Sequence, residues 1–480
     1  MRLVAFAACL ALVVYLFRVD KQKSDDTSLA LWIPLAWMFF AGSRFLSHWL
    51  GTGFGGDATD GSPIDRTLFF GLMAAALVVV IRRRVDWKGI FFRNKWVWLF
   101  FAFGILSAVW SPFPAVSLKR DFKAIGNILM VLVMLTEPRP YAAVGAVLRR
   151  LGYLTLPLSV VFIKWLPEMG RAYHSTGLAM YTGVGMQKNS LGQLCLLVGI
   201  YCAWSLLYKP SRPITLLNSR IRVEWLLIAM IAWLMTMANS ATALMSLMAA
   251  VLAMSLGRFL FNGRPVQLVG FTVATVLTVV ALESSLNITT FVIEALGRRP
   301  DLTTRLPMWE DILARQAGNP FLGVGYEAYW LTPQGLESFD IWKVGNTHNG
   351  YLETYLSSGL IGLAVLIAAL LTTLWSVARH PKEDFMGAVL RLSFLIVAAL
   401  YNWTESTFRG VSNIWIVFFI ASMDVGLRRA VTEAVNAPVS MRLWRSRVPP
   451  GPRPPGARPA PHSAIRGASG ARSAIARRSR

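Results

Sequence analysis

The sequence predicts an all-α polytopic membrane protein, with about 11–13 transmembrane helices and one long loop on the outer side that carries short helices. Composition is the first reason: the chain has 480 residues, of which 55% are hydrophobic and 15% charged, and its mean hydropathy is +0.50. Soluble domains are about one quarter charged, so these charges are too few to cover a globule of this size. The composition argues against a soluble enzyme, a disordered protein and a coiled coil.

The second reason is a series of apolar runs, because a spanning helix needs roughly 20 mostly apolar residues. These runs centre on residues 3–17, 29–43, 67–81, 96–110, 124–136, 151–163, 190–208, 223–238, 241–257, 266–282, 351–377, 387–401 and 411–424. The first run has the length of a signal-peptide core, but only Arg2 precedes it and no clear small-residue cleavage site follows. We therefore predict a helix there.

The third reason is the distribution of Lys and Arg among the loops. Basic loops alternate with the others along the chain, and together with the C-terminus they hold 33 of the 48 Lys and Arg residues. These loops are 18–28, 82–95, 137–150, 209–222, 258–264 and 379–391. Because cytoplasmic loops of membrane proteins are enriched in Lys and Arg, we place them in the cytoplasm and the N-terminus outside. The net charge of +23 then needs no nucleic-acid partner.

The chain divides into a multi-spanning membrane domain, residues 1–424, and a basic cytoplasmic tail, residues 425–480. Within the first, residues 283–350 form a large outer loop with eight of the 25 acidic residues, and loops of this length are usually functional. The tail is rich in Arg, Pro, Gly, Ala and Ser, so we expect it to be disordered and to contact anionic lipids. No internal repeat points to a transporter.

Several motifs of nucleotide- and metal-dependent enzymes are absent from the sequence. It contains no P-loop, no DxD-type metal pair and no HExxH motif, and the two glycines Gly323 and Gly325 alone do not indicate a nucleotide loop. Cys9, Cys195 and Cys202 lie inside apolar runs without metal-ligand neighbours, so we predict no disulfide and no zinc site. We therefore expect any transfer reaction here to use no nucleotide sugar, no cofactor and no bound metal.

Basic residues collect on the outer side, where the preference for positive charge inside acts against them. They are Lys119, Arg120, Lys123, Arg171, Lys188, Arg298, Arg299, Arg305 and Arg409. An anionic ligand such as a diphosphate would explain them, since Arg grips phosphate oxygens with a two-pronged fork and Lys acts as a point charge. The alternative is contact with lipid headgroups, or pairing with Asp121, Glu168 or Asp301.

His348 lies where the long loop re-enters the membrane, in the stretch Asn346-Thr-His-Asn-Gly-Tyr-Leu-Glu353. We expect Asn346 or Thr347 to cap the new helix and His348 to lie in its first turn. A neutral imidazole at this place can accept a proton or a hydrogen bond from a hydroxyl group. The alternative is that His348 only supplies a hydrogen bond at the start of the helix.

A short amphipathic helix is predicted earlier in the same loop. Residues at i, i+4, i+7 and i+11 share one face of it: Arg305, Trp309, Ile312 and Gln316. Asn319-Pro320 ends the helix, and Gly323-Val-Gly325 permits a sharp turn. Such a helix can lie on the membrane surface and hold Arg305 over a groove.

These stretches together resemble the signature region of the O-antigen ligase/polymerase family. The most specific part consists of Arg305-Leu-Pro-Met-Trp309, Asn319-Pro-Phe-Leu-Gly323-Val-Gly325, Thr347-His-Asn-Gly-Tyr-Leu352 and Gly359-Leu-Ile-Gly362. Further similar stretches are Gly183-Val-Gly-Met-Gln-Lys188-Asn189-Ser-Leu-Gly192, Asn239-Ser-Ala-Thr-Ala-Leu244, Leu156-Pro-Leu-Ser159 and Ser107-Ala-Val-Trp110-Ser111, of which the last two fit the bacterial exopolysaccharide polymerase branch. The resemblance covers most of residues 29–424. Ala241 departs from it, because some members have Arg there.

The resemblance implies a glycosyltransferase of the bacterial inner membrane whose active site faces the periplasm. Its donor would be a polyprenyl-diphosphate-linked oligosaccharide and its acceptor a growing glycan, with polysaccharide export or chain-length proteins as further partners. Arg305 and His348 would be the central catalytic pair, with Glu405 as another catalytic candidate. The candidates for diphosphate or substrate binding are Arg120, Arg171, Lys188, Asn189, Asn349 and Arg409.

Several functions remain open on the sequence. The first is polymerisation of lipid-linked repeat units into exopolysaccharide or O-antigen, which the exopolysaccharide-branch stretches favour, and the second is ligation of a finished glycan to lipid A core or protein. A transporter of lipid-linked glycans would usually show repeat symmetry. A non-catalytic assembly partner would not need the polar cluster. Glu405, in Trp403-Thr-Glu-Ser406, has the alternative role of pairing with Arg409 one turn away.

Overall fold

The computed structural model describes residues 1–23, 27–52, 62–83, 85–173, 177, 179–209, 213–216, 219–286, 302–316 and 318–426. They lie in one compact unit, Met1–Leu427, and the second unit, Arg428–Arg480, falls outside them. Most of the described chain is helical. Its strands form antiparallel hairpins, β1 (Arg171–Tyr173) with β2 (Ala179–Tyr181) and β3 (Pro213–Leu216) with β4 (Ser219–Arg222). The predicted all-α membrane architecture is confirmed, whereas the predicted tail lies outside the described residues beyond position 426.

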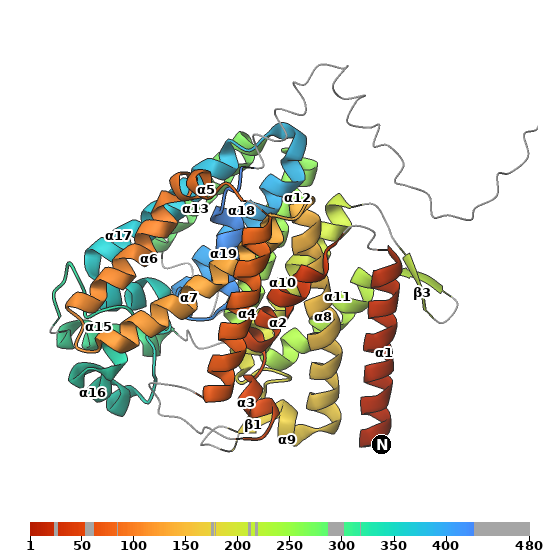
Figure 1. Cartoon of the computed structure of the whole chain (residues 1–480), viewed down its shortest axis with the longest axis horizontal. Helices are drawn as coiled ribbons and strands as arrows, with labels where there is room; N and C mark the ends of the chain where they lie inside the picture. Colours follow the sequence, from red (N-terminus) through yellow and green to blue (C-terminus); the bar gives the residue numbers. More distant parts are fainter. Residues whose placement is uncertain are drawn as a thin grey trace, which may run out of the picture. The chain divides into compact units, whose positions relative to one another are not determined.

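Every one of the predicted apolar runs falls on a helix. In chain order the helices are α1 (Arg2–Lys23), η1 (Leu29–Leu31), α2 (Trp32–Gly42), α3 (Leu46–Trp49), α4 (Pro63–Arg82), α5 (Trp87–Arg93), α6 (Lys95–Leu106), η2 (Ser107–Val109), α7 (Pro114–Leu135), α8 (Pro140–Trp165), α9 (Pro167–Gly170), α10 (Lys188–Tyr208), α11 (Val223–Ala238), α12 (Ala241–Phe259), α13 (Pro265–Leu286), α15 (Leu302–Arg315), η3 (Tyr329–Leu331), α16 (Pro333–Trp342), α17 (Gly350–Ala378), η4 (Lys382–Asp384), α18 (Phe385–Thr404) and α19 (Asn413–Ser422). Figure 1 shows α15 and α16 at the same end of the bundle as α3, α9 and the start of α1.

Among the described helices, seven are long and apolar enough to cross a membrane, namely α1, α4, α8, α10, α12, α17 and α18. The helices α5 and α6 meet at 88° and form an eighth span if they are taken together. Shorter apolar helices of 10–17 residues include α11, α19, the stretch Leu29–Gly42 formed by η1 and α2, and the stretch Pro265–Ala281 of α13. The first half of α7 carries Lys119, Arg120, Asp121 and Lys123. A count of 11–13 spans requires these additional helices to cross as well, and it stays a prediction.

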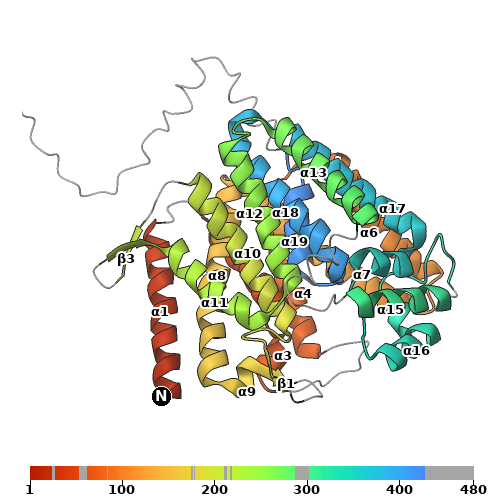
Figure 2. The same cartoon turned by 180° about the vertical axis from the view of Figure 1, so that it is seen from behind.

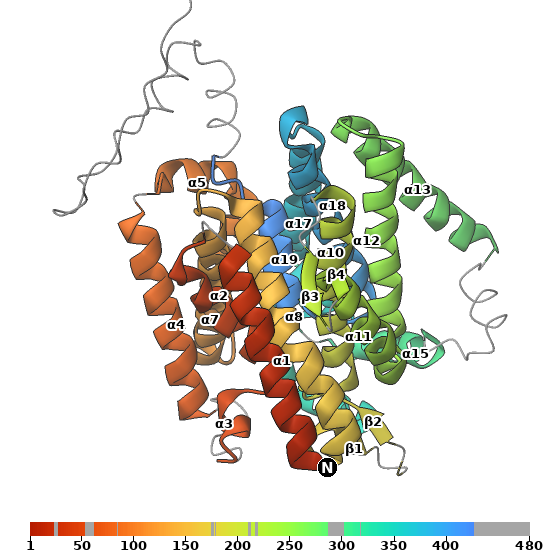
Figure 3. The ribbon, with the colours of Figure 1, turned by 90° about the vertical axis from the view of Figure 1, so that its right-hand side faces the viewer.

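Ion pairs near both ends join α1 to α8, which run antiparallel and side by side (Figure 3). Near the start of α1, Arg2 Nη1 lies 3.3 Å from Oε1 of Glu168, just beyond the end of α8. Near the end of α1, Asp20 Oδ2 lies 2.8 Å from Arg150 Nε, and the other oxygen of Asp20 pairs with Arg149. The predicted cytoplasmic loops 18–28 and 137–150 therefore lie at the same end of this helix pair.

The interior of the bundle is formed by α10, α18 and α19, which Figure 2 shows in the middle of the molecule. Large side chains on these three helices are fully buried, among them Trp204, Tyr401 and Trp415. Outer helices keep apolar side chains exposed, as Leu277 and Val280 of α13 do. A soluble protein would cover such surface, whereas in a membrane protein lipid provides an apolar solvent for it.

A loop around residues 319–325 closes a break in α17. Gly359 has φ of +62° and ψ of −166°, so the helix is interrupted there. Across the break, Leu360 N donates to Pro320 O at 2.9 Å, and Gly325 N donates to Ser357 O at 2.9 Å. A Cβ on Gly359 would lie only 2.3 Å from the backbone of the loop, so glycine is required by both conformation and space. Two of the stretches that carry the family resemblance thus pack directly against each other.

Candidate active site

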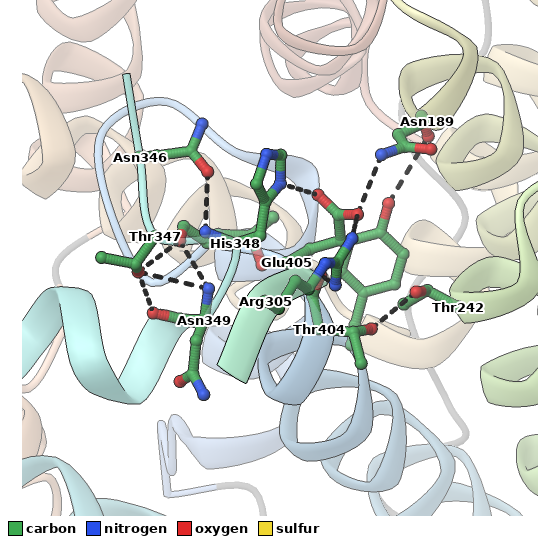
Figure 4. A network of polar contacts seen from close by, with 12 residues as sticks. Asn189, Thr242, Arg305, Asn346, Thr347, His348, Asn349, Thr404 and Glu405 are labelled. Carbon is green, nitrogen blue, oxygen red and sulfur yellow. Dashed lines mark hydrogen bonds and ion pairs between the residues drawn. The ribbon is translucent and has the colours of Figure 1, made fainter. Parts of the chain in front are cut away.

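Glu405 is the centre of a group of polar side chains at one end of the helix bundle. It follows the last residue of α18, and its Oε1 accepts a 2.8 Å hydrogen bond from Asn189 Nδ2 at the start of α10. The same oxygen lies 3.6 Å from Arg305 Nη2, and Oε2 lies 3.4 Å from His348 Nδ1 (Figure 4). The side chains of Arg305, His348 and Glu405 remain 21%, 28% and 13% exposed, so a substrate can reach them.

Two hydrogen bonds to backbone carbonyl groups, one from Arg305 itself and one from Trp309, hold Arg305 in place. Its Nη1 donates to the carbonyl oxygen of Thr404, the last residue of α18. One turn further along α15, Trp309 Nε1 donates at 2.8 Å to the carbonyl oxygen of Thr347, in the loop that carries His348. The predicted amphipathic helix is therefore confirmed as α15, and the contacts of its inner face hold Arg305 beside Glu405.

His348 has a left-handed backbone conformation with φ of +50°, which costs a residue other than glycine about 1–2 kcal/mol. Its N–H donates to Asn346 Oδ1 at 2.9 Å, which stabilises the turn. The helix cap is Asn349, whose Oδ1 accepts 3.0 Å hydrogen bonds from the N–H groups of the second and third helical residues. The prediction that Asn346 or Thr347 caps α17 is wrong, and His348 precedes the helix rather than lying in its first turn.

Arg409 pairs with Glu353 and not with Glu405. Its Nη1 donates to Glu353 Oε1 at 2.6 Å, and its Nε lies 3.9 Å from Glu327 Oε2. Burial alone would lower the pKa of Arg409, but the two carboxylates outweigh that effect and raise it. The alternative in which Glu405 serves only to pair with Arg409 is therefore wrong, and the carboxylate of Glu405 faces Arg305 and His348.

The remaining candidates for substrate binding differ in their surroundings. Arg120 of α7 donates to the carbonyl oxygen of Glu327. Arg171 of β1 donates from Nε and Nη2 to the carbonyl oxygen of Ile163, in the last turn of α8, at 3.2 and 2.9 Å. Lys188 is exposed at the first position of α10, directly before Asn189. The binding roles of these residues, and that of Asn349 beyond its cap, stay predictions.

The acidic residues considered as partners for these cations have other surroundings. Glu168 pairs with Arg2. Asp121 is fully buried on α7, its carboxylate faces Gly104 of α6, and it makes no hydrogen bond to any residue that the structure describes. Three residues singled out by the sequence lie outside the described residues: Arg298, Arg299 and Asp301.

Two carboxylates at this site were not assigned a role from the sequence. Glu353 is buried in the first turn of α17 and accepts hydrogen bonds from Thr347, Trp330 and Arg409. Its position gave a usable signal, because an ionisable residue at the start of a spanning helix is functional by default. Glu327 accepts a 2.6 Å hydrogen bond from the N–H of Gly410 in a loop with no comparable pattern, so its contact depends on tertiary structure alone.

The arrangement places a cation, a carboxylate and an imidazole around one point. A guanidinium such as that of Arg305 can stabilise negative charge that develops on a leaving group. The imidazole of His348, paired with the Glu405 carboxylate, can take a proton from an attacking hydroxyl group. Among the described residues, no group of three or more His, Cys, Asp and Glu side chains is arranged to hold a metal ion. The geometry therefore suits acid–base chemistry on an anionic substrate.

A known family and a known protein resemble the chain that carries this geometry. Residues 225–367 match a family model described as O-antigen ligase, a segment that includes Arg305, His348 and Glu353. The chain is also 25% identical over 398 residues to the exopolysaccharide production protein ExoQ of Rhizobium meliloti (strain 1021), covering 78% of this chain and 85% of that protein. Both findings support the O-antigen ligase/polymerase family for this chain. Glu405 and Asn189 lie outside the segment matched by the family model, and the fold brings both to the residues inside it.

Proposed function

We propose that this protein is a member of the O-antigen ligase/polymerase family that polymerises polyprenyl-diphosphate-linked oligosaccharide repeat units into exopolysaccharide or O-antigen at the periplasmic face of the inner membrane. The single observation that carries the proposal is the contact of Glu405 with both Arg305 and His348 at one end of a membrane helix bundle. The similarity to a protein named for exopolysaccharide production supports the choice of polymer.

The leaving group explains why a cation is needed here. Transfer of the glycan breaks the bond between the anomeric carbon and the diphosphate, and the electron pair of that bond moves to a phosphate oxygen. Arg305 sits at the bundle end where a lipid-borne diphosphate would lie, so it can stabilise this charge. Lys188 is exposed beside Asn189 and can add a second positive charge. Since the glycosyl diphosphate is already activated, the proposed reaction uses no nucleotide sugar.

The acceptor hydroxyl explains the imidazole and the carboxylate. As its oxygen attacks the anomeric carbon from the side opposite the diphosphate, its proton passes to His348 or Glu405, which lie 3.4 Å apart. A direct displacement of this kind inverts the configuration at that carbon. Asn189 donates to Glu405 and would keep the carboxylate turned toward His348.

Ligation is the second candidate, because the family model that matches residues 225–367 is described as O-antigen ligase. In that reaction a finished lipid-linked glycan would move to lipid A core or to a protein. The bond broken and the proton transferred are the same as in polymerisation. The two candidates differ only in the acceptor.

The experiment that tests the proposal uses the full chain, purified in detergent or nanodiscs and incubated with a polyprenyl-diphosphate oligosaccharide. No nucleotide is added, and parallel reactions contain a metal chelator. A polymerase should produce a ladder of products that differ by one repeat unit and should release polyprenyl diphosphate. Arg305→Ala and His348→Ala serve as inactive references.

The outcomes separate the candidates. A single transfer to added lipid A core without a ladder would favour ligation. An unaltered donor, under conditions in which the protein remains folded, would contradict both. Loss of activity in the chelator reaction alone would contradict the expectation of a metal-independent enzyme.

A further inference from the structure

Glu353 connects the two loops that carry the candidate catalytic residues. Its Oε2 accepts 3.0 Å hydrogen bonds from both the N–H and the Oγ1–H of Thr347, the residue before His348. Its Oε1 accepts a 2.6 Å hydrogen bond from Nη1 of Arg409, in the loop that begins with Glu405. A further 2.6 Å hydrogen bond to Oε1 comes from Trp330 Nε1. One carboxylate therefore binds both loops at once.

The connection is buried and charged, so it is strong. The side chain of Glu353 is only 5% exposed, and Arg409 supplies a positive charge that compensates its carboxylate. Hydrogen bonds to a charged acceptor contribute more than neutral ones, and an acid in the first turn of a helix also interacts favourably with the helix dipole. A direct contact between the two loops, from Asn349 N to Ser406 Oγ at 3.0 Å, lies alongside.

We propose that Glu353 is a positioning residue for glycan transfer, which fixes His348 and Glu405 at the separation that the reaction needs. The inference rests on the proposed function, because Glu353 can position His348 and Glu405 for transfer only if they carry it out. It assigns Glu353 no contact with substrate. His348 is held in the left-handed conformation by its neighbours, and Thr347, the neighbour on its N-terminal side, is bound to Glu353. Misplacement of a reacting group by about 1 Å can lower turnover about a hundredfold.

The test is Glu353→Gln, which preserves the shape of the side chain and removes its charge and one acceptor oxygen. We expect kcat to fall by about tenfold to a hundredfold while KM for the lipid-linked donor stays within about twofold, because substrate contacts are unchanged. Glu337→Gln on α16, where the side chain is 57% exposed, is the matched control and should leave both constants unchanged. A wild-type kcat in Glu353→Gln, or a raised KM alone, would overturn the proposal.

A second variant separates positioning from a general loss of structure. Thr347→Val removes the Oγ1 hydrogen bonds to Glu353 and Ser406 and those to the backbone of Asn349, and it leaves the carboxylate in place. If Glu353 acts through Thr347, the losses in kcat of the two single variants will not add in the double variant. Additive losses would contradict the inference. Should Glu353→Gln fail to reach the membrane, Glu353→Asp replaces it, because it keeps the charge and shortens the reach to Thr347 and Arg409: a reduced kcat at unchanged KM supports the proposal, and an unchanged kcat overturns it.

The reference variants show which of the two proposals fails. If Arg305→Ala and His348→Ala are inactive but Glu353→Gln is fully active, only the positioning role is wrong. If Arg305→Ala and His348→Ala both retain normal transfer, the proposed function itself is wrong.

Discussion

The backbone of His348 adopts an unfavourable left-handed conformation, and its ring points toward Glu405. Hydrogen bonds on both sides, from Asn346 and from the cap at Asn349, offset the conformational cost of about 1–2 kcal/mol. Strain of this kind is common at functional sites, where the side-chain position matters more than local stability. The ring of His348 and its backbone therefore have separate requirements.

We expect His348→Asn and His348→Ala to differ in stability but not in activity. Asn tolerates the left-handed region, so His348→Asn should unfold at a temperature close to that of the parent, whereas Ala should lower stability by about 1 kcal/mol. Both variants lack the imidazole and should lose about a hundredfold or more in turnover. Transfer rates and thermal unfolding in detergent measure the two effects. A fully active His348→Asn would leave the ring only a structural role.

Arg305 contacts both the Thr404 carbonyl and Glu405, which requires the fork of a guanidinium. We expect Arg305→Ala to reduce turnover by about a hundredfold to a thousandfold, with Arg305→Lys in between, because Lys keeps the charge but not both contacts. Arg315→Ala, on the same helix and paired with Asp311 and Glu337, is the control and should transfer glycan normally. Equal rates for Arg305→Lys and wild type would show that charge alone suffices.

Single residues of the site were predictable from the sequence only in part. Arg305 and His348 stood out in local patterns, their catalytic roles and the candidacy of Glu405 came from the family resemblance, and the structure brings the three side chains together. Glu327 and the pairing of Arg409 with Glu353 were missed, since they join loops about 60 to 80 positions apart and leave no periodic signal. Which of several acids pairs with a given Arg is decided by tertiary packing, as the wrong pairing of Glu405 with Arg409 illustrates.

At the scale of elements, the break in α17 is the feature that ties the long loop to the membrane helices. The backbone of residues 320 and 321 supplies acceptors for N–H groups that the interrupted helix cannot satisfy. The predicted turn at Gly323-Val-Gly325 is confirmed, with φ of +67° and +106° at its glycines. The sequence did not predict the break itself, because the apolar run 351–377 continues through Gly359 without a change in composition.

Gly359→Ala should destabilise the protein by about 1–3 kcal/mol. Its φ of +62° disfavours a side chain, and the new Cβ would lie 2.3 Å from the backbone of Phe321. Gly270→Ala in α13 is the control, because nothing lies within 4 Å of its Cβ and alanine favours helix. The midpoint of thermal unfolding in detergent measures both. A Gly359→Ala variant as stable as wild type would show that the loop moves aside easily.

At the scale of the whole molecule, hydrophobicity and charge sufficed to predict the architecture. The apolar runs located the helices because each segment that crosses the lipid must be apolar along most of its length. They did not settle which helices cross, since α7 carries four charged residues in its first half and several others are short. Of these, α19 is buried along its whole length, and a covered helix does not need the full length or apolarity of one that faces lipid.

The orientation of the molecule can be tested by labelling introduced cysteines. Asp340→Cys on α16 and Lys382→Cys beyond α17 are exposed near opposite ends of that helix, and Cys9, Cys195 and Cys202 are buried. We expect a reagent that cannot cross the inner membrane to label Asp340→Cys in intact cells and Lys382→Cys only after lysis. The reverse pattern would place the Arg305–Glu405–His348 group in the cytoplasm and contradict the proposed periplasmic reaction.

The ion pairs between α1 and α8 also bear on how the chain is made. Asp20 contacts Arg149 and Arg150, about 130 positions later in the chain. At a synthesis rate of about 5–20 residues per second, the ribosome needs roughly 6 to 26 seconds to add those residues. During this interval the first helix has been synthesised while its counter-charges do not yet exist. Docking of the first helix onto α8 therefore has to wait until Arg149 and Arg150 have been made.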